Sequence, residues 1–198
     1  MPYINKIVDY INTTLKGDTL ARKAFQGGRF YSLAKQIVVQ GTEEDTLRPF
    51  VFELNGRKEI DPFINDVYSF QIYHRCNGQT FSFKNGQAFG DGVSIITETS
   101  NMIAVVYGDP ERLAITQEDL AFLIVAGLPT NLGSIEIGNT SLGQIEIKAG
   151  TINHNSLQVF TAEYGAGVYP LNPQSIYFSL SYTIETNSDK GCLACEDC

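Results

Sequence analysis

The chain has 198 residues, a hydrophobic fraction of 43% and a formal net charge of −8, which suits one large domain with a substantial core. Its basic residues are scattered, and Arg22-Lys23 and Arg57-Lys58 are the only adjacent pairs. Because binding to nucleic-acid phosphates needs clustered Lys and Arg, the composition argues against a nucleic-acid-binding protein.

No segment of the chain has the pattern of a targeting sequence. Polar and charged residues interrupt the first ten positions, so they do not form the apolar core of a signal peptide. The apolar run at 120–128 is far shorter than the roughly 20 residues that span a bilayer. Three of the four cysteines lie within the last seven positions, which is not a distributed disulfide framework. We therefore expect a protein made in a reducing cytoplasm, without a membrane partner.

The first element is predicted to be an amphipathic helix that ends near Gly17. Its apolar residues recur with the 3.6-residue period of a helix. The residues of this stripe are Ile4, Ile7, Val8, Ile11 and Leu15.

Strands are predicted to dominate the middle of the chain. Two of them lie between Phe30 and Leu54, and the alternation in 67–76 indicates a third. Asn77-Gly78 is a preferred dipeptide of a two-residue hairpin turn, so we expect 79–84 to return as the next strand. The continuous apolar run Met102–Tyr107 is typical of a buried central strand.

A second helix is predicted over Thr116–Ala126. Thr116, with Asp119 three residues later, resembles a capping box at its start. Gly127 is a residue type that commonly ends a helix.

Two near-identical segments, 133–138 and 143–148, predict a hairpin joined by 139–142. Because an isolated two-stranded ribbon is barely stable in water, its isoleucine face must pack on something, either the same domain's core or a neighbouring subunit. The candidate oligomer contacts are Ile135, Ile137, Ile145 and Ile147. The opposite face carries Glu136 and Glu146, which we expect to face solvent or a lumen.

The segment 176–185 alternates without exception and predicts a long strand with one face on a core and one in water. The apolar side holds Ile176, Phe178, Leu180, Tyr182 and Ile184, and the other side holds Tyr177, Ser179, Ser181, Thr183 and Glu185.

These elements predict an α+β fold. An antiparallel sheet, sandwich-like or partly closed, carries the N-terminal helix and a second helix packed on one face. We expect a single domain over 1–186, with a hairpin arm at about 133–150, and a flexible tail over 187–198.

The spacing of Cys192, Cys195 and Cys198 would let their thiolates share a metal ion, with Cys76 or a histidine as a fourth ligand. The alternative is that these cysteines have no function or link subunits. We predict no resident metal or cofactor.

No motif indicates an enzyme. His74 and His154 lack metal-binding spacing, and we expect both at the surface or at a sheet edge. A nucleophilic pair of Cys76 and His154 stays open, because such partners meet only in the fold. The glycine-rich stretch 86–92 lacks the Lys-Ser/Thr and the helix of a phosphate-binding loop.

The layout resembles the neck, tail-completion and tail-terminator ring proteins of tailed bacteriophages. The resemblance is carried by Met102–Asp109, by the helix that follows it, and by Ala162–Tyr164 leading to the strand Phe178–Ile184. It implies a non-enzymatic virion protein, assembled in the host bacterial cytoplasm, that forms a homo-oligomeric ring between head and tail. Its partners would be other copies of itself and the flanking head or tail proteins, and genomic DNA would pass through without specific binding.

A different class of function fits the same residues. A monomeric β-rich module that binds carbohydrate or peptide would present exposed tyrosines, such as Tyr164 and Tyr169, on a concave face. The two classes differ in oligomeric state and in the exposure of these rings.

Overall fold

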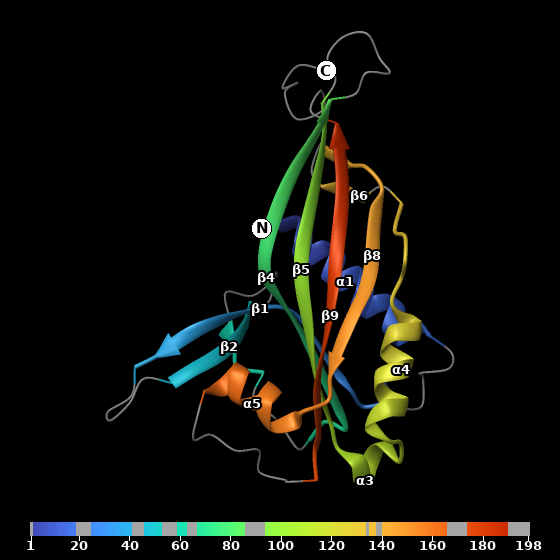
Figure 1. Cartoon of the computed structure of the whole chain (residues 1–198). Coiled ribbons are helices and arrows are strands. Elements are labelled where there is room, and N and C mark those ends of the chain that lie inside the picture. The colour runs from blue at the N-terminus through green and yellow to red at the C-terminus, as the bar shows by residue number, and fades with distance from the viewer. Residues whose placement is uncertain are drawn as a thin grey trace.

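One open sheet of seven strands forms the centre of the computed structural model (Figure 1). The structure describes residues 2–18, 25–40, 46–52, 59–62, 67–85, 94–133, 135–137, 140–165 and 174–189. The strand order is β3-β2-β1-β4-β5-β9-β8. The strands are β1 (Arg29–Val39), β2 (Thr46–Phe52), β3 (Glu59–Ile60), β4 (Phe70–Asn85), β5 (Ser94–Gly108), β8 (Ile145–Asn153) and β9 (Ile176–Asp189). A small second sheet pairs β6 (Ile135–Ile137) with β7 (Thr140–Leu142).

The predicted α+β class is confirmed, with the N-terminal helix and further helices packed on the sheet. The sheet is open, however, rather than sandwich-like or partly closed. It is also mixed, because β1 and β4 run parallel while the other neighbouring strands are antiparallel. The hairpin of β1 and β2 turns away from the centre, so the chain crosses back before β4 joins the inner edge of β1.

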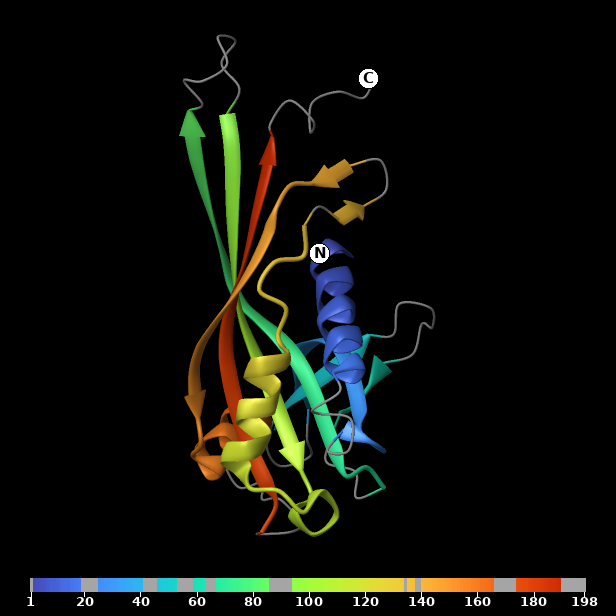
Figure 2. The same ribbon diagram turned by 90° about the vertical axis from the view of Figure 1, so that its right-hand side faces the viewer.

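Helices cover both faces of the lower part of this sheet (Figures 1 and 2). The helices are α1 (Pro2–Gly17), the short α3 (Pro110–Leu113), α4 (Gln117–Gly127) and α5 (Ser156–Tyr164). None of the helices in the described ranges is long and apolar enough to cross a membrane.

The first core lies between the sheet and the pair α1 and α4. All five predicted stripe residues of α1 are fully buried there, which confirms the period-based prediction. The second predicted helix is also confirmed, since Thr116 caps α4 by accepting a hydrogen bond from the Asp119 backbone N–H. The predicted central strand is β5, which β4 and β9 flank.

The second core lies on the opposite face, under α5, a helix that the sequence pattern did not predict. Asn155 starts α5 by accepting a hydrogen bond from the Gln158 backbone N–H, and Phe160 and Tyr164 pack on the sheet. Tyr177 is buried in this core, so its predicted exposure on the polar face of the last strand is wrong. The apolar side of β9 is buried as predicted.

The predicted hairpin turn at Asn77-Gly78 is wrong. β4 runs straight through this dipeptide to Asn85, and its partner is β5 throughout. The register shifts where Cys76 faces Met102 and Gly78 faces Asn101, so Asn77 is the extra residue of a β-bulge. An Asn-Gly dipeptide tolerates the backbone of a tight turn, and in this chain it adopts the irregular backbone of a bulge instead.

The ribbon predicted at 133–150 exists in a different register. Residues 140–142 form a strand, β7, rather than the connection between two strands, and β7 pairs with β6. The antiparallel register of β6 and β7 continues outside this small sheet, where Asn131 lies opposite Glu146. The remainder of the second segment is β8, which adds to the main sheet beside β9.

The predicted boundary between domain and tail lies three residues too early. β9 continues to Asp189, which lies opposite Ile95 of β5, so 187–189 belong to the sheet. The three C-terminal cysteines lie outside the described residues.

Candidate functional site

Three strands extend past the helices and form the candidate interaction surface, with Ile184 at its base still in the first core. We call this part the extension and define it as 77–85 of β4, 94–101 of β5 and 183–189 of β9. Figures 1 and 2 show its strands rising past α1, α4 and α5. The two strand pairs are antiparallel and stay in register up to the pairs Asn85–Ser94 and Ile95–Asp189.

One edge of the extension has no partner among the described residues. β1 pairs with β4 only from Arg29 to Ala34, opposite Gln71 to Arg75. Beyond the bulge, residues 79–85 pair with β5 on one side, and no described strand pairs on the other. Phe81 sits in this edge and is 58% exposed. Native sheets normally protect such an edge, because its unpaired N–H and C=O groups recruit another strand.

The two faces of the extension differ in chemistry. On the face turned away from α1, no helix covers the sheet within the described ranges. Its side chains are short and mostly neutral: Thr80, Ser82, Thr97, Thr99, Asn101, Thr183 and Asn187. Thr97 donates a hydrogen bond to the Asn187 side chain at 2.7 Å, which ties β5 to β9. This face is polar, and its carboxylate Glu185 is paired with Lys148 of β8 at 3.1 Å.

On the opposite face, the start of α1 is attached to the base of the extension. The Tyr3 hydroxyl donates to the Glu98 carboxylate, and the Gln79 amide donates to the Tyr3 hydroxyl at 3.0 Å and to Ser100 at 3.1 Å. Burial and the hydrogen bond to Glu98 raise the pKa of Tyr3, so its hydroxyl stays protonated and remains a donor. The cluster fixes the strands where they leave the core.

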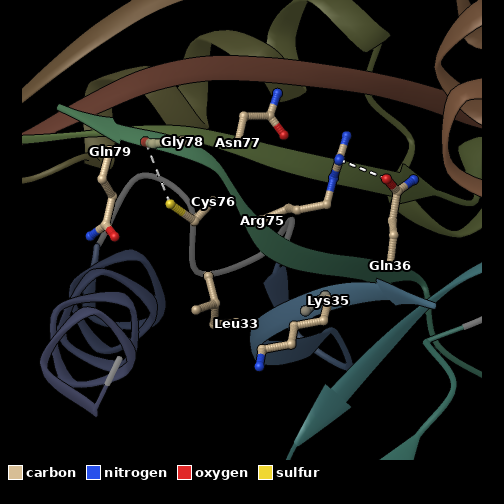
Figure 3. Close-up of a pocket in the computed structure, with 9 residues that line it drawn as sticks. Leu33, Lys35, Gln36, Arg75, Cys76, Asn77, Gly78 and Gln79 are labelled. Carbon is tan, nitrogen blue, oxygen red and sulfur yellow. Dashed lines mark hydrogen bonds between the residues drawn. The ribbon is translucent and has the colours of Figure 1, made fainter.

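A cavity of about 450 Å³ opens where β1 and β4 separate (Figure 3). It is lined by Leu33, Ala34, Lys35 and Gln36 from β1 and by Arg75, Cys76, Asn77, Gly78 and Gln79 from β4. The bulge residue Asn77 therefore lies at the point where β4 loses its neighbour and its free edge begins. The cavity carries two cations and no carboxylate.

Arg75 connects this cavity to the second core. Its guanidinium donates to Gln36 at 2.8 Å, as Figure 3 shows, and forms a 2.9 Å ion pair with Glu163 of α5. Tyr73 donates to the other oxygen of Glu163 at 3.0 Å. Burial raises the pKa of Glu163, and the Arg75 charge opposes that rise. Lys35 of β1 is the second cation in the lining of the cavity.

His74 is not at the surface or at an edge, as we had expected, but fully buried beneath α1. Its Nε2 lies 3.0 Å from the Asn12 side-chain oxygen, and its Nδ1 lies 2.8 Å from the Tyr182 hydroxyl. Burial lowers the pKa of His74 to about 3, so the ring is neutral. It donates to Asn12 and accepts from Tyr182, which holds α1 in register on the sheet.

The predicted oligomer contacts occupy different places. Ile145 and Ile147 are buried in the chain's own first core, which favours the first of the two packing alternatives for this pair. The side chains of Ile135, Ile137 and Glu136 lie outside the described residues. Glu146 forms an ion pair of 3.3 Å with Lys148, on the polar face.

The structure does not bring Cys76 and His154 together. Cys76 lies on β4, whereas His154 follows β8, and β5 and β9 lie between them. Three strand spacings of about 4.8 Å separate the two strands. His154 is exposed, as predicted, and hydrogen-bonds Gln117. Among the described residues, no three His, Cys, Asp or Glu side chains gather as a metal site would need.

Tyr164, which a binding module would need at the surface, is 1% exposed. Tyr169 lies outside the described residues. Sequence reasoning placed Phe81 in a strand but missed its edge position, because the turn assigned to Asn77-Gly78 gave that strand a false partner.

The chain matches no protein-family model, and a search of curated proteins finds no match.

Proposed function

We propose that the chain is a structural virion protein that assembles into a ring in the neck or tail of a tailed bacteriophage, joins head to tail and lines the DNA passage. The observation that carries the proposal is the open edge of β4 beyond the bulge, with Phe81 exposed on it. A second copy of the chain completes this edge by adding a strand.

The chemistry of the helix-free face supports the lumen part of the proposal. Threonine, serine and asparagine dominate this face, and Lys148 beside them is paired with Glu146 and Glu185. Such a surface offers few charges to DNA phosphates, so DNA can slide past without being held. The net charge of −8 acts in the same direction.

The alternative, a monomeric module that binds carbohydrate or peptide, has less support. It called for tyrosines on an exposed concave face, and Tyr164 is instead packed against Phe160 in the second core.

Native mass spectrometry of the wild-type chain and of Phe81→Lys tests the proposal. We expect a wild-type oligomer of fixed size and a folded Phe81→Lys monomer, because an edge lysine resists strand addition. Val67→Lys is the control, since Val67 is 72% exposed at the far end of the molecule, just before β4. A wild-type chain that stays monomeric, or a Phe81→Lys chain that assembles like the wild type, would contradict the proposal.

A further inference from the structure

We infer that the free edge of β4 pairs with the outer edge of β8 of the next copy, so that four strands of each copy join one continuous sheet. The inference rests on the proposed function and names the partner surface that the ring would use. Both edges belong to the main sheet, and they lie at opposite ends of the segment β4-β5-β9-β8.

The outer edge of β8, like the free edge of β4, is unpaired over a defined stretch. Up to Ile147, the outer side of β8 is covered by 130–133, through hydrogen bonds such as that from the Ile147 backbone N–H to the Thr130 carbonyl. From Lys148 to Asn153, no described strand pairs on that side. Lys148, Ala149, Gly150 and Thr151 are all exposed.

Strand direction allows the two edges to meet. The three neighbouring pairs within β4-β5-β9-β8 are all antiparallel, so β4 and β8 run in opposite directions. A second copy placed beside the first, with its β8 against β4, therefore continues the antiparallel alternation. Two different edges that meet in this way make a head-to-tail contact, which closes into a ring or continues as a filament.

The offset between the two edges fits a closed sheet. Within one chain, Ala149 lies level with Cys76, through Tyr182 and Met102. Pairing Ala149 of the next copy with the middle of the free edge, near Phe81, requires a shift of about four residues over four strands, because the bulged Asn77 adds no length along the sheet. This shift corresponds to a strand tilt of about 35°. Closed barrels have tilts of about 35–45°, so this offset is compatible with closure.

The faces also match across such a joint. Phe81 is on the same face as Gln79, which contacts α1, and Ile152 is on the same face of β8, packed against the first core. The opposite face would carry Thr80 of one copy beside Thr151 of the next. Ala149, which pairs with the core residue Tyr182, is also on the α1 face. In this joint, half-exposed Phe81 thus gains Ala149 of the next copy as a covering neighbour.

Two variants with complementary blocked edges test the inference. Thr80→Lys/Phe81→Lys blocks β4, and Ala149→Lys/Thr151→Lys blocks β8. Each alone is expected to be a monomer at the concentration at which the wild type forms rings, and an equimolar mixture is expected to give a one-to-one heterodimer through the two intact edges. Thr99→Lys/Asn101→Lys, on the middle strand β5, is the matched control and should still form rings.

The outcomes separate this inference from the proposed function. If the β8-blocked variant alone forms rings or symmetric dimers, or if the mixture gives no heterodimer, the assignment of β8 as the partner is wrong, whereas loss of assembly in the β4-blocked variant would still support the ring. If the β4-blocked variant assembles normally, both fail. Thermal unfolding of each variant establishes that a monomer is folded.

Discussion

The lower sheet and the extension are built from the same strands but are held in different ways. In the lower part, both faces of β4, β5 and β9 are packed, against α1 and α4 on one side and α5 on the other. In the extension, one face is polar and bare of helices within the described ranges, and one edge is open. A strand that continues past its own core, at full length and in register, is more than the folding of one chain requires. We therefore propose that the lower part serves the fold and that the extension serves contact with other subunits.

The largest effect is expected where the sequence had suggested a contact between subunits. Ile145→Asp should prevent folding rather than only assembly, because Ile145 is fully buried in the first core and an unpaired buried carboxylate costs several kcal/mol. Thr99→Asp, on the polar face of the extension, should leave the unfolding midpoint nearly unchanged. Urea denaturation measures both, and a folded, monomeric Ile145→Asp chain would restore Ile145 as an oligomer contact.

Protonation of His74 should weaken the lower part in acid. The folded pKa of about 3 lies below the ordinary value of 6.5, so the unfolded chain takes up this proton first as the pH falls. The stabilisation of the folded state by neutral His74 is complete above pH 6.5 and is lost progressively toward pH 3. In the middle of that range, the free energy of unfolding falls by about 1.4 kcal/mol per pH unit.

The matched variant for this test is His74→Gln, which keeps a donor and an acceptor but does not titrate. The difference in unfolding free energy between wild type and His74→Gln should shrink from pH 7 to pH 4. A difference that is independent of pH would show that His74 is not held neutral beneath α1.

The ion pair between Arg75 and Glu163 should contribute less to the free energy of unfolding than neutral His74 does. Glu163→Gln removes the charge that faces Arg75 and should cost about 2 kcal/mol, less than for a fully buried pair because the Arg75 side chain is 19% exposed. Glu146→Gln, in an exposed ion pair with Lys148, is the control and should change stability by less than about 1 kcal/mol. Equal losses in the two variants would show that the Arg75–Glu163 pair stabilises the fold no more than an exposed ion pair does.

The smallest effect is expected within the extension. Thr97→Val removes the hydrogen bond to Asn187 and should cost about 1 kcal/mol, the usual net value of one such bond. Chemical denaturation gives this value, and a loss of several kcal/mol would mean that the extension carries more of the fold than its single polar ties indicate.

Local patterns in the sequence predicted the elements that local physics determines. The α1 stripe, the Thr116 cap and the alternation of β9 each follow from the period of a helix or strand, and each is present. The errors arose where pairing partners decide the outcome. Asn77-Gly78 suits a turn as well as a bulge, and only the long register with β5 selects the bulge. The open edge next to Phe81 follows from that register too, so no local pattern could have indicated it.

Hydrogen–deuterium exchange at two protein concentrations tests the central claim most directly. In dilute, monomeric protein, amides of 102–107 in the packed part of β5 should be protected, while those of 79–85 that point to the open edge should exchange quickly. Under assembling conditions, 79–85 should gain protection and 102–107 should stay as they were. Protection of 79–85 that is already complete in the monomer, or that does not rise on assembly, would contradict the account.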